Sequence, residues 1–370
     1  MSFERYKFSK EIDIEFFTTL RRRVNDYFKS NAISKYGNRS MVIKSIFMLT
    51  LYFAPLVLML TGITDNVWIL FILWVIMGFG KGGVGLCIMH DANHGAYSSN
   101  KKVNQWMSYT INLIGANTAL WKIQHNVLHH TYTNIHQADE DIEVPLFLRF
   151  SPHQKRYWIH RFQHLYVWFF YGISTLSWVT VRDFLQWVRY KKKGLIAEKK
   201  ARKELVQIIG WKLFYFGYIL VLPMVILPVS PWMVVLLFIC MHFVTGLTLS
   251  LIFQTAHVMP TSDFPLPNEN GSMESNWAVH QLATTTNFAP RSKVFSWLIG
   301  GLNYQVEHHL FSNICHIHYR DISKIVAKTA SEFNIPYHSQ KNFLLAVWNH
   351  AKMLYWLGRT ELIPPSPIKH

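Results

Sequence analysis

The composition of this 370-residue chain is typical of a membrane protein. Half of the residues are apolar and 16% are charged, whereas about 25% of the residues in a soluble protein are charged. The formal net charge of +16 suits anionic lipid headgroups or an acidic protein partner, and the apolar content argues against a nucleic-acid partner. The three cysteines include no CxxC pair, so neither a disulfide framework nor a zinc knuckle is indicated.

The first element in chain order is a surface helix within residues 9–36. Ile12, Phe16, Leu20 and Val24 recur at helical spacing, and Ser9 is the expected N-cap. We therefore expect residues 1–40 to form a cytoplasmic amphipathic segment. A membrane domain over residues 41–330 and a cytoplasmic segment over 331–370 follow it.

Four apolar stretches are long enough to cross a bilayer, which takes about 20 residues. The connectors between the first and second stretches, and between the third and fourth, contain no Lys or Arg. The basic residues gather before residue 43 and between residues 101 and 203, so the positive-inside rule places both termini and residues 89–210 in the cytoplasm. This predicts an all-α integral membrane protein with four transmembrane helices in two hairpins and a cytoplasmic helical cap. The expected spans are 43–63, 67–88, 211–228 and 231–254.

Two further apolar stretches and one polar loop complete the outline. Residues 108–120 are too short to span, and residues 165–181 are rich in aromatic side chains, which favour the membrane boundary. We expect both to be interfacial or re-entrant helices. Residues 259–276 are polar and Pro-rich, which predicts a flexible loop.

The spacing of the histidines carries the chemistry. HxxxH and HH patterns place imidazoles on one helix face, and they lie at or after the cytoplasmic ends of the predicted spans. Because eight imidazoles are too many for one ion, two metals are implied, and imidazole alone does not choose among zinc, copper, iron and nickel. We expect His257 and His316 to be hydrogen-bonded residues rather than ligands. The candidate ligands are His90, His94, His125, His129, His130, His280, His308 and His309.

At these motifs the sequence resembles the membrane fatty acid desaturase family. The resemblance covers about residues 40–330 and rests on His90 to Gly95, His125 to Asn134 and Gln305 to Phe311, which are similar to that family's three histidine boxes. It implies a centre of two iron ions that uses O2 and two electrons to desaturate a fatty acyl chain. It also implies that Asn276, acting through water, and His280 form an additional ligand pair. Gln305 stands where many members have His. Its amide oxygen can either coordinate a metal weakly or only form a hydrogen bond to a neighbour.

Acidic residues beside the boxes are candidates for holding the far nitrogen of each ligating ring. They are Asp91, Asp139, Asp141 and Glu307. The glycine-rich run from Gly78 to Gly85 has neither a GxGxxG nor a GK[ST] pattern, so it is no nucleotide loop. Small residues in a span allow close helix packing, and Gly82 and Gly85 are our candidates for lining an acyl tunnel.

No haem, iron–sulfur or flavin motif occurs in the sequence. We therefore expect electrons from a separate ferredoxin or small cytochrome that docks on the basic surface. The expected setting is a bacterial inner membrane, or the endoplasmic reticulum in a eukaryote, with the active site facing the cytoplasm.

Two alternatives stay open. Hydroxylation or ketolation uses the same two-metal scaffold, with the outcome set by how the C–H bonds are presented. A metal transporter would need ionisable residues near the middle of the spans, where Lys81 and His242 are the candidates.

Overall fold

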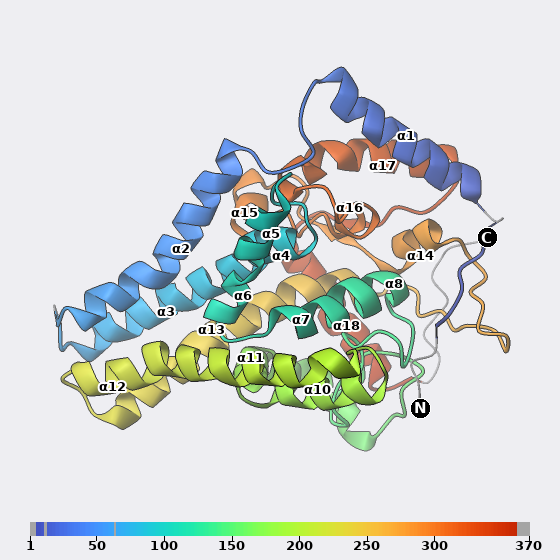
Figure 1. Cartoon of the computed structure of the whole chain (residues 1–370). Helices are drawn as coiled ribbons and strands as arrows, with labels where there is room; N and C mark the ends of the chain where they lie inside the picture. The colour runs from blue at the N-terminus through green and yellow to red at the C-terminus, as the bar shows by residue number, and fades with distance from the viewer. Residues whose placement is uncertain (1–4, 11–12, 63, 361–370) are drawn as a thin grey trace. The chain divides into compact units, whose positions relative to one another are not determined.

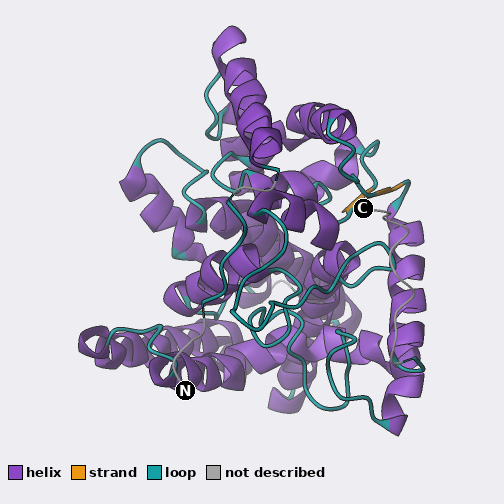
Figure 2. Cartoon of the chain, turned by 90° about the vertical axis from the view of Figure 1, so that its right-hand side faces the viewer, coloured by secondary structure: helices purple, strands orange, loops and turns teal. Residues whose placement is uncertain are grey.

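The computed structural model describes residues 5–10, 13–62 and 64–360, most of which are helical (Figure 1, Figure 2). Ile12 of the expected surface helix and residues 361–370 of the expected C-terminal segment lie outside the described residues. The chain folds into two compact units. Among the described residues, the first unit contains 38–123 and 168–250, and the second contains 5–37, 124–167 and 251–360.

In the part of the chain that the structure describes, four helices are long and apolar enough to cross a membrane: Arg39–Leu60, Val67–Asn93, Glu198–Ile226 and Pro231–His257. They match the four predicted stretches. The third begins well before the expected residue 211, because the charged residues ahead of the apolar stretch are good helix formers that extend the same helix. Large apolar side chains of these helices face outward, including Ile46, Phe71 and Leu213, as expected of helices surrounded by lipid.

The first unit consists of these apolar helices and of shorter helices between them. Within the second and third apolar helices of this unit, η1 (Val84–Met89) and η5 (Gly217–Val221) have π-helical rather than α-helical hydrogen bonds. Its elements are α2 (Arg39–Leu60), α3 (Val67–Gly83), η1 (Val84–Met89), α4 (His90–Asn93), α5 (Lys101–Ser108), α6 (Thr110–Leu113), α7 (Thr118–Trp121), η4 (Trp178–Arg182), α10 (Asp183–Lys192), α11 (Glu198–Phe216), η5 (Gly217–Val221) and α12 (Leu222–Ile226). Three elements continue from one unit into the other: η2 (Lys122–His129), α9 (Gln163–Ser177) and α13 (Pro231–His257).

Glycine allows close packing of the spans in the first unit. A Cβ atom on Gly80 would lie 2.5 Å from the backbone nitrogen of Tyr52 in α2, and one on Gly78 would lie 2.8 Å from the backbone oxygen of Met241 in α13. By contrast, Cβ atoms on Gly82 and Gly85 would meet only side chains, at 3.7 Å, which is ordinary contact. Gly78 and Gly80 are therefore packing positions, whereas Gly82 and Gly85 leave room for a small side chain.

The ionisable groups in the middle of the spans bond to one another. The Lys81 ammonium donates to the Tyr215 hydroxyl at 2.6 Å, and that hydroxyl lies 2.8 Å from His242 Nε2. The other ring nitrogen of His242 lies 3.0 Å from the hydroxyl of Thr175. These bonds tie α3, α9, α11 and α13 together, so Lys81 and His242 have a structural role that requires no transport pathway.

The expected interfacial stretches form helices as well. Residues 165–181 belong to a continuous helical segment that starts with α9 and runs through η4 into α10. This segment is not among the four helices that are long and apolar enough to span a membrane. Residues 108–120 form the short helices α6 and α7 with a turn between them.

The second unit contains short helices packed on the N-terminal helix. Its only sheet among the described residues is a parallel pair in which Asn287 aligns with Ser339. The elements are α1 (Ile14–Ser30), α8 (His130–Tyr132), η3 (Trp158–Phe162), α14 (Trp277–Thr284), β1 (Asn287–Phe288), α15 (Lys293–Leu298), α16 (Gln305–Leu310), η6 (His316–His318), α17 (Tyr319–Glu332), β2 (Ser339–Gln340) and α18 (Phe343–Leu357).

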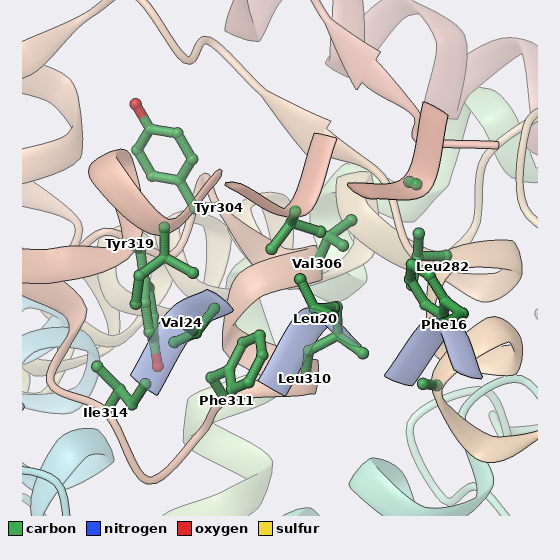
Figure 3. Close-up of a cluster of buried hydrophobic side chains, with 14 residues drawn as sticks. Phe16, Leu20, Val24, Leu282, Tyr304, Val306, Leu310, Phe311, Ile314 and Tyr319 are labelled. Carbon is green, nitrogen blue, oxygen red and sulfur yellow. The ribbon is translucent and has the colours of Figure 1, made fainter. Parts of the chain in front are cut away.

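The amphipathic pattern of α1 builds the core of the second unit (Figure 3). Phe16, Leu20 and Val24, at most 1% exposed, pack in one cluster with Val306 and Leu310 of α16. Burial of each such side chain contributes about 1.5–3 kcal/mol. Because α16 carries two candidate ligands, this packing fixes the element on which they stand.

The expected N-cap at Ser9 is wrong. Helix α1 begins at Ile14 after Asp13, and the backbone nitrogen of Ser9 instead donates to the carbonyl oxygen of Ser275. Residues 7–9 pair with the chain near residues 271–275, and this pairing keeps them extended. The predicted polar loop over 259–276 is therefore attached to the N-terminal segment.

Candidate metal centre

Two histidine motifs coincide with π-helical turns. Segment η1 ends directly before His90, and η2 contains both His125 and His129. In a π-helix the backbone bonds join residues five apart, so His125 approaches His130. The two ring centroids are 4.6 Å apart, against 5.4 Å between His125 and His129. The pairing differs from the α-helical one that the sequence predicts, and π-turns of this kind occur frequently at functional sites.

One group of three imidazoles consists of His125, His130 and His308, with His130 in the middle. Its Nε2 lies 3.1 Å from Nε2 of His125 and 2.9 Å from Nε2 of His308. All three side chains are buried. These residues come from η2, α8 and α16, so the turn after η2 and the packing of α16 together bring three nitrogens to one point.

A second group of three consists of His129, His257 and His309. One ligand atom from each lies within 4.8 Å of the others, and all three side chains are buried. The ring of His257 is 4.7 Å from that of His129 and 4.8 Å from that of His309. The stacked rings of His130 and His309, 4.4 Å apart, connect the two groups.

Hydrogen bonds at Nδ1 orient the rings of both groups. Nδ1 of His309 lies 2.8 Å from Oε1 of Gln281, and Nδ1 of His257 lies 3.2 Å from the carbonyl oxygen of Thr284. Nδ1 of His308 lies 3.2 Å from the hydroxyl of Tyr319. A ring that donates from Nδ1 presents the lone pair of Nε2 to a metal.

Carboxylates hold His129. Its Nδ1 lies 3.1 Å from both oxygens of Asp139 and 3.4 Å from an oxygen of Asp141. Burial lowers the pKa of His129, but these two carboxylates outweigh burial and raise it to about 9. The same local field that favours a proton on this ring favours a metal cation beside it. Asp139 and Asp141 are therefore placed to hold the far nitrogen of a candidate ligand ring.

Glu307 has a different environment. Its carboxylate accepts from Asn287 Nδ2 at 2.8 Å and from the Tyr337 hydroxyl at 2.9 Å. Burial raises the pKa of Glu307 to about 7. Among the described residues it bonds to no imidazole, so its bonds join α16 to β1 and to the residues just before β2 rather than orient a ligand.

The expected pair Asn276 and His280 makes other contacts. Asn276 is the N-cap of α14, where its side-chain oxygen accepts from the backbone nitrogen of Ala278 at 2.9 Å. Nε2 of His280 lies 2.8 Å from the carbonyl oxygen of Thr133, and burial lowers the pKa of His280 to about 4. Neither residue belongs to the groups of ligand atoms described above.

His257, for which the sequence favoured a hydrogen-bonded role, has its ring beside those of His129 and His309. It ends the fourth apolar helix, and a histidine at the polar end of a membrane span is a functional signal in itself. That signal was outweighed by the separation of His257 from any HxxxH or HH pattern. Gln281, Thr284 and Tyr319 were missed because partners of ligand rings have no fixed sequence spacing.

The first unit carries His90, His94 and Asp91. The rings of His90 and His94 are 5.0 Å apart, and the Trp121 ring lies at 5.6 and 5.9 Å from them, respectively. Asp91 is buried, and its carbonyl oxygen accepts from the backbone nitrogen of Ala96 at 2.8 Å. The HxxxH spacing therefore places the rings of His90 and His94 next to each other, packed against Trp121.

The donor atoms of the second unit fit a bound metal. Nitrogens bound to one ion at about 2.1 Å lie roughly 3 Å apart, which is the spacing around His130. In addition, Nε2 of His257 and both amide atoms of Gln305 are buried with no hydrogen-bond partner among the described residues. Such atoms are costly unless a ligand or water satisfies them. Neutral imidazoles of this kind suit zinc, copper, iron or nickel.

Comparisons with known proteins agree with the chemistry of the site. The family model for fatty acid desaturases matches residues 66–341. The acyl-lipid (8-3)-desaturase of Physcomitrium patens is 37% identical over 94% of this chain and 72% of its own length. The sn-1 linoleoyl-lipid 6-desaturase of Arthrospira platensis is 34% identical, covering 95% of this chain and 94% of its own length. The sn-1 linoleoyl-lipid 6-desaturase of Synechocystis is 33% identical, covering 97% of this chain and 99% of its own length.

Proposed function

Since this chain belongs to the fatty acid desaturase family, and is thus an oxidoreductase of fatty acyl chains, we propose that it introduces a cis double bond into a lipid-linked acyl chain. The reaction removes one hydrogen from each of two adjacent methylenes. One O2, two electrons and two protons are consumed with these hydrogens, and two waters are released. The relatives named for acyl-lipid and linoleoyl-lipid substrates support a lipid-linked chain. Acyl-CoA is the other carrier to be tested.

The observation that carries the proposal is the convergence of buried imidazole nitrogens around His130 and His257. We assign two iron ions to the six imidazoles of these two groups. His90 and His94 of the first unit stay candidate ligands on the family resemblance alone. We also assign to His257 the role expected of His280, because its unpaired Nε2 is available for a metal. Gln305 is assigned a contact with the centre, through its amide or through water.

When bound, the two irons supply the O2-dependent oxidation of C–H bonds. The residues of the chain hold and orient the ligand rings. The carboxylate of Asp139 fixes His129, Gln281 fixes His309 and Tyr319 fixes His308. Burial of all these groups keeps bulk water away from the oxidising centre.

The electrons come from a separate protein in this proposal. The net charge of +16 supports docking of an acidic ferredoxin or small cytochrome by electrostatic attraction. The distribution of Lys and Arg supports a multi-pass topology in two hairpins, with both termini and the metal-binding segments on the cytoplasmic side. The membrane is the bacterial inner membrane, or the endoplasmic reticulum in a eukaryote.

The test is expression with a ferredoxin system in a bacterial host that is fed stearate, oleate or linoleate. Total fatty acids are then profiled by mass spectrometry with localisation of the double bonds. We expect a new unsaturated product that is absent from a His129→Ala control. A hydroxylated or keto product would retain the metal centre and replace desaturation by the rival reaction, which the named relatives do not favour. A purified protein without iron would contradict the proposal.

A further inference from the structure

A cavity of about 470 Å³ lies beside His94 in the first unit. It begins where the span Val67–Asn93 ends and extends along α5. Its lining is mostly polar and includes two lysines. The residues around it are Ala92, Asn93, His94, Gly95, Lys101, Asn104, Gln105, Ser108, Tyr109, Thr118 and Lys122.

The two lysines of this cavity carry positive charge that the described part of the chain does not neutralise by an ion pair. No carboxylate among the described residues forms an ion pair with Lys101 or Lys122. Lys122 is partly buried, and this burial lowers the pKa of its ammonium. A partly desolvated ammonium is unfavourable unless an anion is bound beside it, so Lys122 points to an anionic ligand.

Most other polar groups of the cavity are already satisfied. The Ser108 hydroxyl donates to the carbonyl oxygen of Gln105 at 2.8 Å, and the Thr118 hydroxyl donates to that of Ser108 at 3.3 Å. The side-chain nitrogen of Asn104 donates to the carbonyl oxygen of Ser98 at 2.6 Å. The two ammonium groups, with the exposed Gln105 beside them, are the cationic and amide groups of the lining that can meet a ligand.

The position of the cavity suits a headgroup of the membrane surface. It adjoins the end of a span, and Trp106 on α5 is 72% exposed, as tryptophans at the membrane–water boundary are. Trp121, which precedes Lys122 in the chain, contacts the rings of both His90 and His94. A polar group bound here therefore lies next to candidate metal ligands.

We propose that this cavity binds the phosphate of the headgroup to which the substrate acyl chain is attached, with Lys101 and Lys122 as the phosphate-binding residues. This inference rests on the proposed function and specifies its substrate class. The phosphate belongs either to a phospholipid or to coenzyme A, since both present the same anion. A neutral glycolipid headgroup lacks the charge that the two lysines require.

The test measures binding without turnover. The purified iron-loaded protein in detergent is titrated with three soluble probes: dihexanoyl phosphatidylglycerol, coenzyme A and dihexanoyl digalactosylglycerol. We expect at least one phosphate-bearing probe to bind more tightly than the neutral one. The double variant Lys101→Gln/Lys122→Gln should weaken that binding by roughly tenfold or more for each lysine, as charge-assisted hydrogen bonds are lost. The single variant Lys122→Arg, which keeps the positive charge, should retain most of the affinity of the unmutated protein.

Lys102→Gln is the matched control, because Lys102 is an exposed neighbour that does not line the cavity. Preference for phosphatidylglycerol would identify phospholipid as the carrier, and preference for coenzyme A would identify acyl-CoA. Equal binding of neutral and anionic probes, or an unchanged affinity in the double variant, would overturn the inference. Fatty acid profiling of the same proteins separates the claims, since unaltered phosphate binding without desaturation contradicts only the proposed function.

Discussion

Nδ1 of His129 lies 3.1 Å from both carboxylate oxygens of Asp139, which is fully buried. The same carboxylate accepts from the backbone nitrogens of Asn134 and Asp141, each at 2.9 Å. Three N–H groups thus surround it and hold it in place. A carboxylate fixed in this way orients the ring and makes Nε2 a better electron-pair donor.

Replacing Asp139 should therefore weaken metal binding. In the unmutated protein both oxygens of Asp139 accept from backbone N–H groups. Asp139→Asn removes the charge and places its NH2 group against one of these N–H donors. We expect a loss of roughly 10–100-fold in iron affinity, the usual effect of removing such a partner. Iron retained per protein after competition with a chelator measures it.

The matched control for that variant is Asp141→Asn. Asp141 is 3.4 Å from Nδ1 of His129 and its side chain is 23% exposed, so we expect a smaller loss of iron. Circular dichroism of both variants checks the fold. Equal retention of iron by Asp139→Asn and the unmutated protein would contradict the assigned role of Asp139.

His257 and His280 give opposite expectations when each is replaced by alanine. Each ring has one buried nitrogen without a partner. In His257 this is Nε2, which lies among rings of candidate ligands. In His280 it is Nδ1, because Nε2 lies 2.8 Å from a backbone carbonyl, and His280 belongs to neither group of candidate ligands. We expect His257→Ala to lose iron as His129→Ala does, and His280→Ala to retain most of it. Iron content by mass spectrometry decides between them.

His350→Ala serves as the control for loss of a buried imidazole. Nδ1 of His350 lies 2.9 Å from the carbonyl oxygen of Val258, and this ring belongs to neither group of three imidazoles. Retention of iron by His257→Ala with loss by His280→Ala would restore the assignment made from the sequence.

Glu307 is expected to matter for stability. Glu307→Ala leaves Tyr337 and Asn287 without their shared acceptor in a fully buried position, at a cost of about 1–3 kcal/mol. Glu307→Gln should cost less, because its amide oxygen still accepts and the Tyr337 hydroxyl can accept in turn. Thermal unfolding of the two variants measures the difference. Equal midpoints for Glu307→Ala and the unmutated protein would refute this role.

The sequence predicted the helical class and the four apolar helices because both depend on local patterns. Twenty apolar residues in a row identify a span wherever they pack, and the apolar spacing of α1 identified its buried face at Phe16, Leu20 and Val24. It did not predict the start of α1, because the pairing of residues 7–9 with 271–275 joins segments distant in sequence.

The site was predicted in part for the same reason. The motifs HxxxH and HH identified clusters of rings, but they assumed α-helical geometry. The π-helical turn in η2 brings the ring of His130 closer to that of His125 than the ring of His129 is. His257 has no neighbouring histidine in the sequence and reaches the cluster only through the path of α13, which no local pattern encodes.

Removal of the metal should destabilise the second unit. Two groups of three imidazoles bring nitrogen donors together in the interior, and a metal that binds only the folded state adds about 4 kcal/mol at a thousand times its dissociation constant. We expect chelation to lower the unfolding midpoint and added Fe²⁺ to restore it. In His129→Ala the midpoint should respond weakly to Fe²⁺. A midpoint independent of metal in the unmutated protein would argue against a bound ion.

Variants at two glycines of the second apolar helix distinguish a role in helix packing from a role in substrate binding. A Cβ on Gly80 would lie 2.5 Å from the backbone of α2, so Gly80→Ala forces two helices apart and should destabilise the protein whatever its substrate. A Cβ on Gly85 meets only the Leu249 side chain at 3.7 Å, so Gly85→Ala should fold normally.

If Gly85 lines the acyl tunnel, Gly85→Leu should fill part of that space and shift the products toward shorter chains, with C16 acyl substrates favoured over C20. Gly82→Leu tests the neighbouring position in the same way. The measurement is the product profile from a mixture of chain lengths, with thermal unfolding alongside to separate a blocked tunnel from a damaged fold. An unchanged profile in a stable Gly85→Leu protein would place the tunnel elsewhere, because a leucine side chain cannot occupy the path of an acyl chain without excluding part of it.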